Sequence, residues 1–275
     1  MPELPETETI ARDLDRQVTG ATIVKVGVPK PDVLREVGAI ALRRRIMGTR
    51  IVHCWRRAKL VVLDLSSGDR LVVQPRFTGA LLLDAGQLDQ RERAYATVRL
   101  GLADGRTLLY RDIRRLGTVA LMSPDRFTRY AAALGVEPLD RTFGPGELSA
   151  ILRVSRQAVK KVLMDQRRIA GIGNIYANEA LWRAGLDPSR AARGVTAAEA
   201  RALHAALTAV LLESIDARGT SFRDYRDAHG NAGGFAERLA VYGRAGQPCP
   251  RCGTRLAGTH AIDGRSTVLC ARCQH

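Results

Sequence analysis

The chain has 275 residues, 45% of them hydrophobic, and carries a formal net charge of +15 with a pI near 10.5. That length supports a sizeable core and favours two domains over one. We find no apolar run of membrane-spanning length and no signal peptide, so we expect a soluble, cytoplasmic protein. A globular protein this basic often binds a polyanion, and nucleic acid is the first candidate. An arginine-rich proteome is the alternative explanation.

The first ten residues, MPELPETETI, predict a helix start with one feature that a helix does not explain. Pro5 suits the first helical turn, and Glu6 complements the positive end of the helix dipole. An apolar stripe follows at helical spacing: Ile10, Leu14 and Val18. Pro2 precedes this helix. After removal of Met1, which we expect, Pro2 would carry a free secondary amine.

The rest of the chain predicts an α+β protein. Residues 20–120 contain short β-branched or leucine-rich runs divided by turn signals, which indicates a β-sandwich or barrel of six to eight strands. Residues 34–46 predict a loop or short helix there. Helical periodicity dominates from about residue 125. We divide the chain into a β-sandwich domain with a leading helix (1–130), a helical domain (131–239) and a zinc finger (240–275).

Two C-x-x-C pairs, CPRC and CARC, are separated by seventeen residues near the C-terminus. This spacing is typical of a four-thiolate zinc site, whereas redox dithiols are the alternative. Four protein ligands leave no open position, so we expect one structural zinc ion, held by Cys249, Cys252, Cys270 and Cys273. THAID and STVLC predict two short strands around Gly264. At the hairpin tip, Arg265 is either a phosphate ligand or a solvated turn residue. Cys54 is interpreted as a buried apolar residue.

The stretch GIGNIYANEALW combines glycines with a helix start. Asn174 is expected to be the N-cap residue of this helix. Glycines allow backbone amides to approach an anion, and a helix N-terminus favours a phosphate. The motif therefore predicts either a DNA-phosphate site or a tight turn between packed helices.

Five motifs together resemble the formamidopyrimidine-DNA glycosylase family, which also includes endonuclease VIII. They are PELPETE, RRAKLVVLDL, DIRRLG, GIGNIYANEALW and VYGRAGQPCPRCG with RSTVLCARCQ. The stretch TSFRDYRDAHGNAGGFAERLAVYGR is similar to the lesion-facing loop of the formamidopyrimidine branch. The resemblance spans the chain and implies a β-sandwich, a helix–two-turn–helix domain and a zinc finger, with DNA in a basic cleft.

The resemblance also implies the catalytic residues. Pro2 would attack C1′ of the damaged nucleotide, since a secondary amine gives an iminium that stays cationic. Glu3 would be the acid/base, with Glu6 in support. Lys59 would assist β-elimination, and Arg265 would grip a phosphate and assist δ-elimination. Without the resemblance, Lys59 would be interpreted as a surface residue.

DNA contacts follow by the same matching. They are Tyr95, Arg114, Arg156, Lys160 and Asn174. The apolar pair that fills the DNA stack departs from the usual family residues: Phe77 stands where many members have methionine, and Leu116 where they have an aromatic residue. Both are apolar, as a wedge must be.

We therefore expect a bifunctional DNA glycosylase/AP lyase that acts on oxidised purines such as 8-oxoguanine and formamidopyrimidines. Its partner would be damaged double-stranded DNA, reached by base flipping, and it would act as a monomer in the bacterial cytoplasm. Two alternatives remain at this point. One is an endonuclease VIII-type enzyme for oxidised pyrimidines, and the other is a non-catalytic zinc-finger DNA-binding protein.

Overall fold

The computed structural model describes residues 2–275, so the expected removal of Met1 lies outside the described residues. The chain forms two compact units. The first extends to Ala132 and also includes Ile215–Ala236, and the second comprises Ala133–Ser214 and Glu237–His275. Among the described residues, every helix is too short or too polar to cross a membrane.

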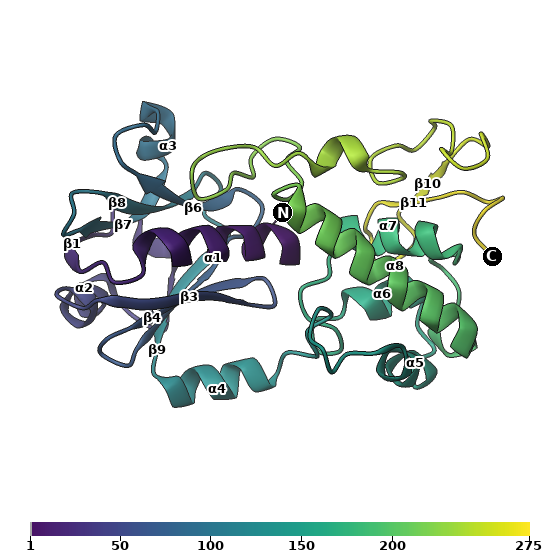
Figure 1. Ribbon diagram of the computed structural model, residues 1–275, viewed down its shortest axis with the longest axis horizontal. Helices are drawn as coiled ribbons and strands as arrows, with labels where there is room; N and C mark the ends of the chain where they lie inside the picture. The colour runs from purple at the N-terminus through teal and green to yellow at the C-terminus, as the bar shows by residue number, and fades with distance from the viewer. Residues whose placement is uncertain (1) are drawn as a thin grey trace. The chain divides into compact units, whose positions relative to one another are not determined.

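The first unit is a β-sandwich of two sheets, as expected, with nine strands among the described residues rather than six to eight (Figure 1). One sheet has the order β1 (Ile23–Gly27), β7 (Ala96–Leu102), β8 (Thr107–Asp112), β6 (Gly79–Asp84). The other has the order β2 (Leu34–Arg35), β9 (Thr118–Met122), β5 (Arg70–Gln74), β4 (Leu60–Leu65), β3 (Ile51–Arg57). Only the short β2–β9 pair is parallel among these strands.

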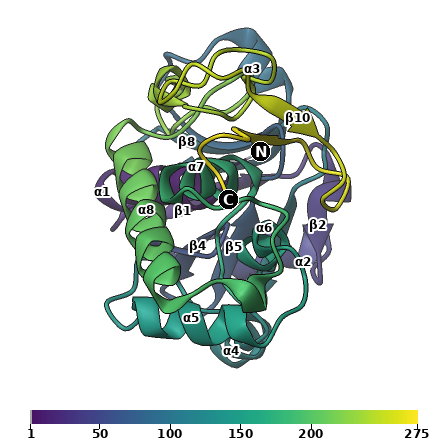
Figure 2. The same ribbon diagram turned by 90° about the vertical axis from the view of Figure 1, so that its right-hand side faces the viewer.

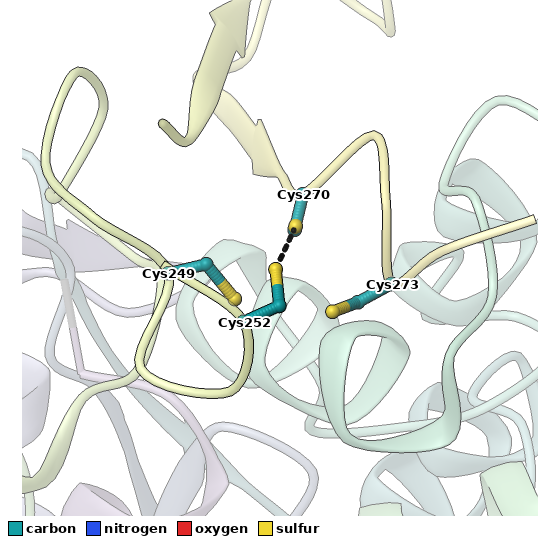
Figure 3. A group of neighbouring side chains, drawn as sticks. All are labelled: Cys249, Cys252, Cys270 and Cys273. Carbon is teal, nitrogen blue, oxygen red and sulfur yellow. Dashed lines mark hydrogen bonds between the residues drawn. The ribbon is translucent and has the colours of Figure 1, made fainter. Parts of the chain in front are cut away.

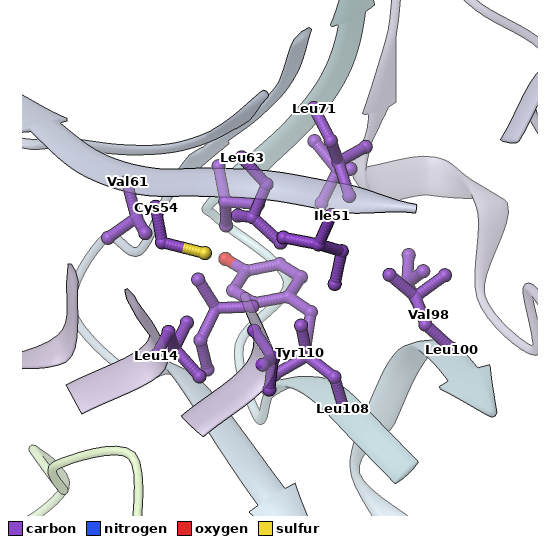
Figure 4. Packing of buried hydrophobic residues seen from close by; sticks show 14 of the residues in the cluster. Leu14, Ile51, Cys54, Val61, Leu63, Leu71, Val98, Leu100, Leu108 and Tyr110 are labelled. Carbon is purple, nitrogen blue, oxygen red and sulfur yellow. The ribbon is translucent and has the colours of Figure 1, made fainter. Parts of the chain in front are cut away.

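Four α-helices belong to this unit: α1 (Leu4–Val18), α2 (Ala39–Ile46), α3 (Gln90–Ala94) and α4 (Pro124–Ala132). Helix α1 confirms the predicted apolar stripe, because Ile10, Leu14 and Val18 are fully buried in the sandwich core. Figure 4 shows Leu14 beside the ring of Tyr110 and the strand residues of the same core. Burial against both sheets therefore fixes the helix that begins the chain.

Residues 215–236 pack with the sandwich although they follow the helical region in sequence. Tyr225 and Ala228 belong to the sandwich core, and the carbonyl of Ala228 accepts a hydrogen bond of 2.8 Å from the N–H of Leu83 in β6. Residues 215–236 therefore belong to the first unit by their packing, although they lie between two parts of the second unit in the sequence. The domain boundaries expected at residues 130 and 239 stay a prediction.

The second unit contains α5 (Pro145–Arg153), α6 (Val159–Met164), α7 (Asn174–Ala184) and most of α8 (Ala197–Asp216). Helix α7 lies beside α8 in both views (Figures 1 and 2), where the hydroxyls of Tyr176 and Ser214 are 2.7 Å apart. Gly185 adopts a left-handed conformation (φ 73°) and ends α7, as a glycine C-cap does.

A two-stranded hairpin completes the second unit, with β10 (Ala257–Thr259) paired to β11 (Thr267–Leu269). The predicted strand over THAID was therefore wrong for all but its first residue. Residues 260–266 form the connection instead, and Asp263 (φ 56°) and Gly264 (φ 65°) both adopt left-handed conformations there. Such conformations interrupt a strand.

Candidate active site and nucleic-acid interface

At the N-terminus of α1, the buried carboxylate of Glu6 binds the backbone of Glu3, the residue that follows Pro2. Glu3 is the N-cap residue of α1, and Pro2 directly precedes it; both are buried. The N–H of Glu3 donates to Oε2 of Glu6 over 2.8 Å, and the N–H of Thr220 donates to Oε1 of Glu6 over 2.8 Å. Glu6 therefore binds two backbone segments at once. That fixes the residue next to Pro2.

Lys59 lies in the tight turn between β3 and β4, and this turn is tied to α1. Ala58 adopts φ 53° in the turn, and Nη1 of Arg56 donates to the Ala58 carbonyl over 3.0 Å. Nε of Arg56 also donates to Oε2 of Glu8 on α1 over 2.7 Å. Burial raises the pKa of Glu8, but the charges and hydrogen bonds of Arg56 and Arg12 outweigh it and lower that pKa overall. The ion pair thus ties the Lys59 turn to α1, the helix that Pro2 and Glu3 precede.

The predicted wedge residues lie on two neighbouring loops at one end of the sandwich. Phe77 is in the β5–β6 loop, and Arg114 and Leu116 are in the β8–β9 loop. The three residues are exposed, and the Arg114 guanidinium stacks on the Phe77 ring, with Cζ 5.2 Å from the ring centroid. Strand pairing of Gly79 with Asp112 joins the two loops at their bases.

Asp112 holds both loops and was not identified from the sequence. Its buried carboxylate accepts hydrogen bonds from the Thr78 hydroxyl (2.6 Å), the Gly117 N–H (2.8 Å) and the Tyr110 hydroxyl (3.2 Å). A Cβ atom on Gly117 would lie 1.8 Å from the Tyr110 hydroxyl oxygen, so only glycine fits there. The sequence signal for this anchor is the motif DIRRLG, in which Asp112 and Gly117 flank the paired arginines.

An arginine-rich pocket of about 390 Å³ adjoins these loops within the first unit. Its lining combines cations, two acids and one phenol: Thr78, Arg91, Glu92, Tyr95, Arg111, Ile113, Arg114, Arg223, Asp224 and Arg226. Arg111 is fully buried behind it and donates to Glu92, to the Thr78 carbonyl and to the Asp224 carbonyl. The predicted contact residue Tyr95 is exposed at this pocket, beside Arg114 on the lining.

In the second unit, side chains from α6 and α7 hold the zinc-finger hairpin. The Ser266 carbonyl accepts from Nζ of Lys160 over 2.9 Å and from Nδ2 of Asn174 over 2.9 Å. The Thr267 hydroxyl accepts from the same Lys160 ammonium over 2.7 Å. Lys160 is fully buried and therefore positions the hairpin, while its direct contact with DNA stays a prediction.

The expected N-cap role of Asn174 was wrong. Gly173 is the N-cap residue, and Asn174 is the first residue of α7, with its side chain directed to the Ser266 carbonyl. Gly173 adopts an extended conformation that lets the chain enter the helix without a side-chain cap. The N-cap assignment does not test whether Asn174 contacts a phosphate, which stays a prediction.

The two remaining predicted phosphate contacts, Arg156 and Arg265, are exposed side chains of the second unit. Arg265 follows the left-handed residues Asp263 and Gly264, and its Nε lies 3.8 Å from an Asp263 carboxylate oxygen. It immediately precedes Ser266, which Lys160 and Asn174 hold. Arg265 therefore projects from a hairpin tip whose base is fixed.

The four predicted zinc ligands lie together (Figure 3). All four sulfur atoms are within 4.8 Å of one another, and those of Cys252 and Cys270 are 3.5 Å apart. Zinc–sulfur bonds of about 2.3 Å in a tetrahedron place the sulfurs about 3.8 Å apart, so the cluster fits zinc. Four clustered cysteines in this arrangement indicate a bound metal ion.

Comparison with known families accounts for nearly the whole chain. The model described as formamidopyrimidine-DNA glycosylase N-terminal domain matches residues 1–119, and the H2TH domain model of the same enzyme matches residues 134–226. A zinc finger found in FPG and IleRS matches residues 246–275. The chain belongs to the formamidopyrimidine-DNA glycosylase family. The resemblance stated from the motifs is therefore confirmed.

Curated relatives support this family over the full length. The formamidopyrimidine-DNA glycosylase of Heliobacterium modesticaldum is 41% identical and that of Thermomicrobium roseum is 42% identical. Each alignment covers 100% of this chain and at least 99% of the relative. The chain therefore carries all three parts of a formamidopyrimidine-DNA glycosylase.

Solved structures of the family have the same fold. The MutM (Fpg) protein of Thermus thermophilus matches with a TM-score of 0.86 and 38% identity, covering 99% of this chain and 98% of that one. A Lactococcus lactis Fpg variant in complex with a Fapy-dG-containing DNA matches with a TM-score of 0.91 and 29% identity over both whole chains. Another Lactococcus lactis complex, with abasic-site DNA, matches equally well over 99% of each chain.

Proposed function

We propose that this chain is a bifunctional DNA glycosylase/AP lyase that removes oxidised purines, 8-oxoguanine and formamidopyrimidines, in base excision repair. The observation that carries the proposal is the N-terminus of α1, where Glu6 binds the N–H of Glu3, next to Pro2. The Pro2 nitrogen would become a free amine after removal of Met1. The family of the chain and the Fapy-dG-containing complex of its Lactococcus lactis relative support the choice of substrate.

In the proposed reaction, the Pro2 nitrogen, a free amine once Met1 is removed, attacks C1′ of the extrahelical nucleotide and the bond from C1′ to the base breaks. The base leaves with the bonding electron pair and takes up a proton, and the Pro2 nitrogen loses the proton that it carried as a secondary amine. Glu3 donates a proton to O4′ as the C1′–O4′ bond opens, which leaves an iminium between Pro2 and C1′. Removal of a proton from C2′ then expels the 3′ phosphate. A second elimination expels the 5′ phosphate. Pro2 forms an iminium that has no N–H proton to lose, so the electron sink persists through both steps.

The other predicted residues have roles in the same scheme. Lys59 and Arg265 would assist the two eliminations, and Arg156, Asn174 and Arg265 would bind phosphates. Phe77 and Leu116 would fill the gap that the flipped nucleotide leaves, and the Arg114–Phe77 stack supports that placement. Tyr95 would meet DNA at the arginine-rich pocket.

We further propose one structural zinc ion per chain, held by the four clustered cysteines, because these leave no position for a substrate. Bound zinc would supply only fold stability to the hairpin that presents Arg265. The protein would act as a monomer on chromosomal DNA in the bacterial cytoplasm, in keeping with its bacterial relatives.

Borohydride trapping tests the proposed function. The reductant converts the iminium into a stable amine, so the wild-type protein should become covalently attached to a duplex that contains 8-oxoguanine opposite cytosine. Pro2→Gly should weaken trapping, and an extra residue ahead of Pro2 should abolish it, because an amide nitrogen is not a nucleophile. Glu3→Gln should stop base excision yet retain cleavage of a pre-formed abasic site, where the base is already absent.

The same assay decides between the alternatives. Trapping mainly on dihydrothymine duplexes would move the protein to the endonuclease VIII type. Retained DNA affinity without an adduct on any duplex, including an abasic one, would mean a binding protein and would contradict the role of Pro2.

A further inference from the structure

Arg218 joins two buried carboxylates that are far apart in the sequence. Its Nη2 lies 2.5 Å from Oδ2 of Asp13, on α1, and 2.6 Å from Oδ2 of Asp227, while Nε lies 2.9 Å from the same Asp227 oxygen. Asp227 is fully buried and Asp13 is 4% exposed. Buried carboxylates are costly unless a cation and hydrogen bonds compensate them, and here one guanidinium serves both.

The backbone at Arg218 is unusual and is held in place. Arg218 adopts φ 63°, a left-handed conformation that a residue with a side chain seldom adopts, and its N–H donates to the Ile215 carbonyl. Its own carbonyl accepts from the hydroxyl of Tyr225, which is buried in the sandwich core. Such strain persists only where surrounding contacts determine the conformation.

From Arg218 a short path leads to the nucleophile end of the chain. The next residue, Gly219 (φ 87°), packs so closely that a Cβ atom would lie 2.9 Å from the Tyr225 ring and 3.0 Å from Cγ of Glu6. The N–H of Thr220 then donates to Glu6, whose other oxygen accepts from Glu3. The ion triad therefore lies two residues from a hydrogen bond that sets the position of Glu6.

Asp227 also orders the far end of the same segment. Its Oδ1 accepts from the N–H groups of His229 and Asn231, each over 2.9 Å, and its own N–H donates to the Asn231 carbonyl. The carboxylate thus closes the turn over residues 227–231 with one oxygen and binds Arg218 with the other. Segment 218–231 is one hydrogen-bonded piece attached to α1 at Asp13 and Glu6.

We propose that the Asp13–Arg218–Asp227 triad is a positioning device for catalysis, which holds segment 218–231 against α1 so that Thr220 and Glu6 fix Glu3 and the adjoining Pro2 amine. The inference rests on the proposed function, in which Pro2 is the nucleophile. In this inference, segment 218–231 positions the N-terminal residues Pro2 and Glu3. That task does not depend on the identity of the damaged base.

A duplex with a pre-formed abasic site separates this task from base recognition, because it offers no base to hold. Under single-turnover conditions with borohydride, Arg218→Ala should trap at least about tenfold more slowly than wild type, since small misplacements of a nucleophile have effects of that size. The dissociation constant for the same duplex should change less than about twofold, because phosphate contacts dominate affinity. Arg218→Lys, which keeps the cation, should recover part of the rate.

The matched control is Arg45→Ala. Arg45 forms an Arg–Asp pair with Asp69 in the same unit, with Nη2 2.6 Å from Oδ1, and neither residue contacts α1 in the hydrogen bonds of the described chain. This variant should trap at the wild-type rate. If Arg218→Ala does not accumulate as folded protein, Asp13→Ala carries the test, because it cuts the link to α1 while Asp227 still pairs with Arg218.

Four outcomes decide the inference or the proposed function. Slow abasic trapping with normal affinity in the Arg218 or Asp13 variant supports the inference. Wild-type abasic trapping in both variants overturns it, and so does a defect confined to 8-oxoguanine duplexes, which would place the segment's task on the base. Failure of the wild-type protein to trap through Pro2 would instead overturn the proposed function.

Discussion

At the scale of single residues, the groups that would approach DNA depend on buried partners that no local pattern reveals. Asp112 accepts three hydrogen bonds and holds the loops of Phe77, Arg114 and Leu116. Asp112→Asn removes the charge and turns one acceptor oxygen into a donor. We expect a loss of about 1–3 kcal/mol in unfolding free energy, as for other buried polar groups left unsatisfied. We also expect DNA binding to weaken.

Urea unfolding and a DNA titration measure the two effects. Asp104→Asn is a suitable control, because Asp104 lies in the β7–β8 turn and pairs only with Arg106 among the ion pairs of the described residues. Unchanged affinity in Asp112→Asn at normal stability would show that the two loops need no such anchor.

The sequence indicated candidate catalytic residues more readily than the residues that position them. The four cysteines stand out by type and spacing, and Pro2 by its place before the first helix, whereas Glu3 and Lys59 follow from the family resemblance. Lys160 was expected at the DNA, because the sequence pattern cannot show that its ammonium is fully buried and binds two atoms of the hairpin. Asn174 was expected to cap a helix, since its residue type favours caps, yet the carbonyl of a residue 92 positions away takes its amide.

At the scale of elements, helix α8 carries a pH-dependent cap. The hydrogen bond of Arg190 lowers the pKa of Glu199 from 4.5 to about 2, with further lowering from the N–H and hydroxyl of Thr196. A carboxyl group with a depressed folded-state pKa stabilises the fold above its unfolded-state value, and that stability is lost as the pH falls towards 2. Because this pair is partly exposed, its contribution at neutral pH should be about 1 kcal/mol or less.

Glu199→Gln should therefore lower the unfolding free energy at pH 7, and the difference from wild type should shrink as the pH is lowered from 5 towards 3. Urea unfolding at several pH values measures this trend. A constant difference across the range would mean that hydrogen bonding to the amide, and not the charge, stabilises the cap.

Long elements with a clear period were predicted well, and short ones were not. Helix α1 follows its apolar spacing, with Ile10, Leu14 and Val18 fully buried, and the helices α7 and α8 lie in the region where helical periodicity was expected. The five-residue α3 and strand β10 did not emerge from the pattern, because their positions depend on contacts such as Arg111 with Glu92, or on the turn that the hairpin needs. Tertiary contacts determine such short segments more than local propensity does.

At the scale of the whole molecule, residues 215–236 illustrate the limit of a linear domain division. Their sequence continues the helical region, but Tyr225 enters the sandwich core and Arg218 pairs with α1. The amino-acid composition does not change at these residues in a way that would predict either contact. The cluster of four cysteines, in contrast, was predictable from cysteine spacing, because metal ligands must lie in the sequence at distances that a tight turn can close.

Loss of the metal should disrupt the hairpin of the second unit and leave the first unit folded. Cys270→Ser should lose the metal and weaken DNA binding, while the sandwich stays folded, since its core contains none of the four cysteines. Elemental analysis and circular dichroism measure these effects. Active protein without zinc would contradict the structural role of the metal.

The charge of +15 predicts binding that depends strongly on salt. Arg114, Arg156 and Arg265 are the proposed cationic phosphate contacts, and Asn174 is a neutral one. If these three arginines and other basic side chains neutralise about four to six phosphates, the slope of log K against log salt should be about −4 to −5. Arg265→Ala should weaken binding to all duplexes alike and make the slope shallower by about one unit, because phosphate contacts carry little sequence information. Fluorescence anisotropy over a salt series measures both effects. A flat titration would mean that the basic side chains do not meet the DNA backbone, and a loss confined to one base sequence would assign Arg265 to base recognition.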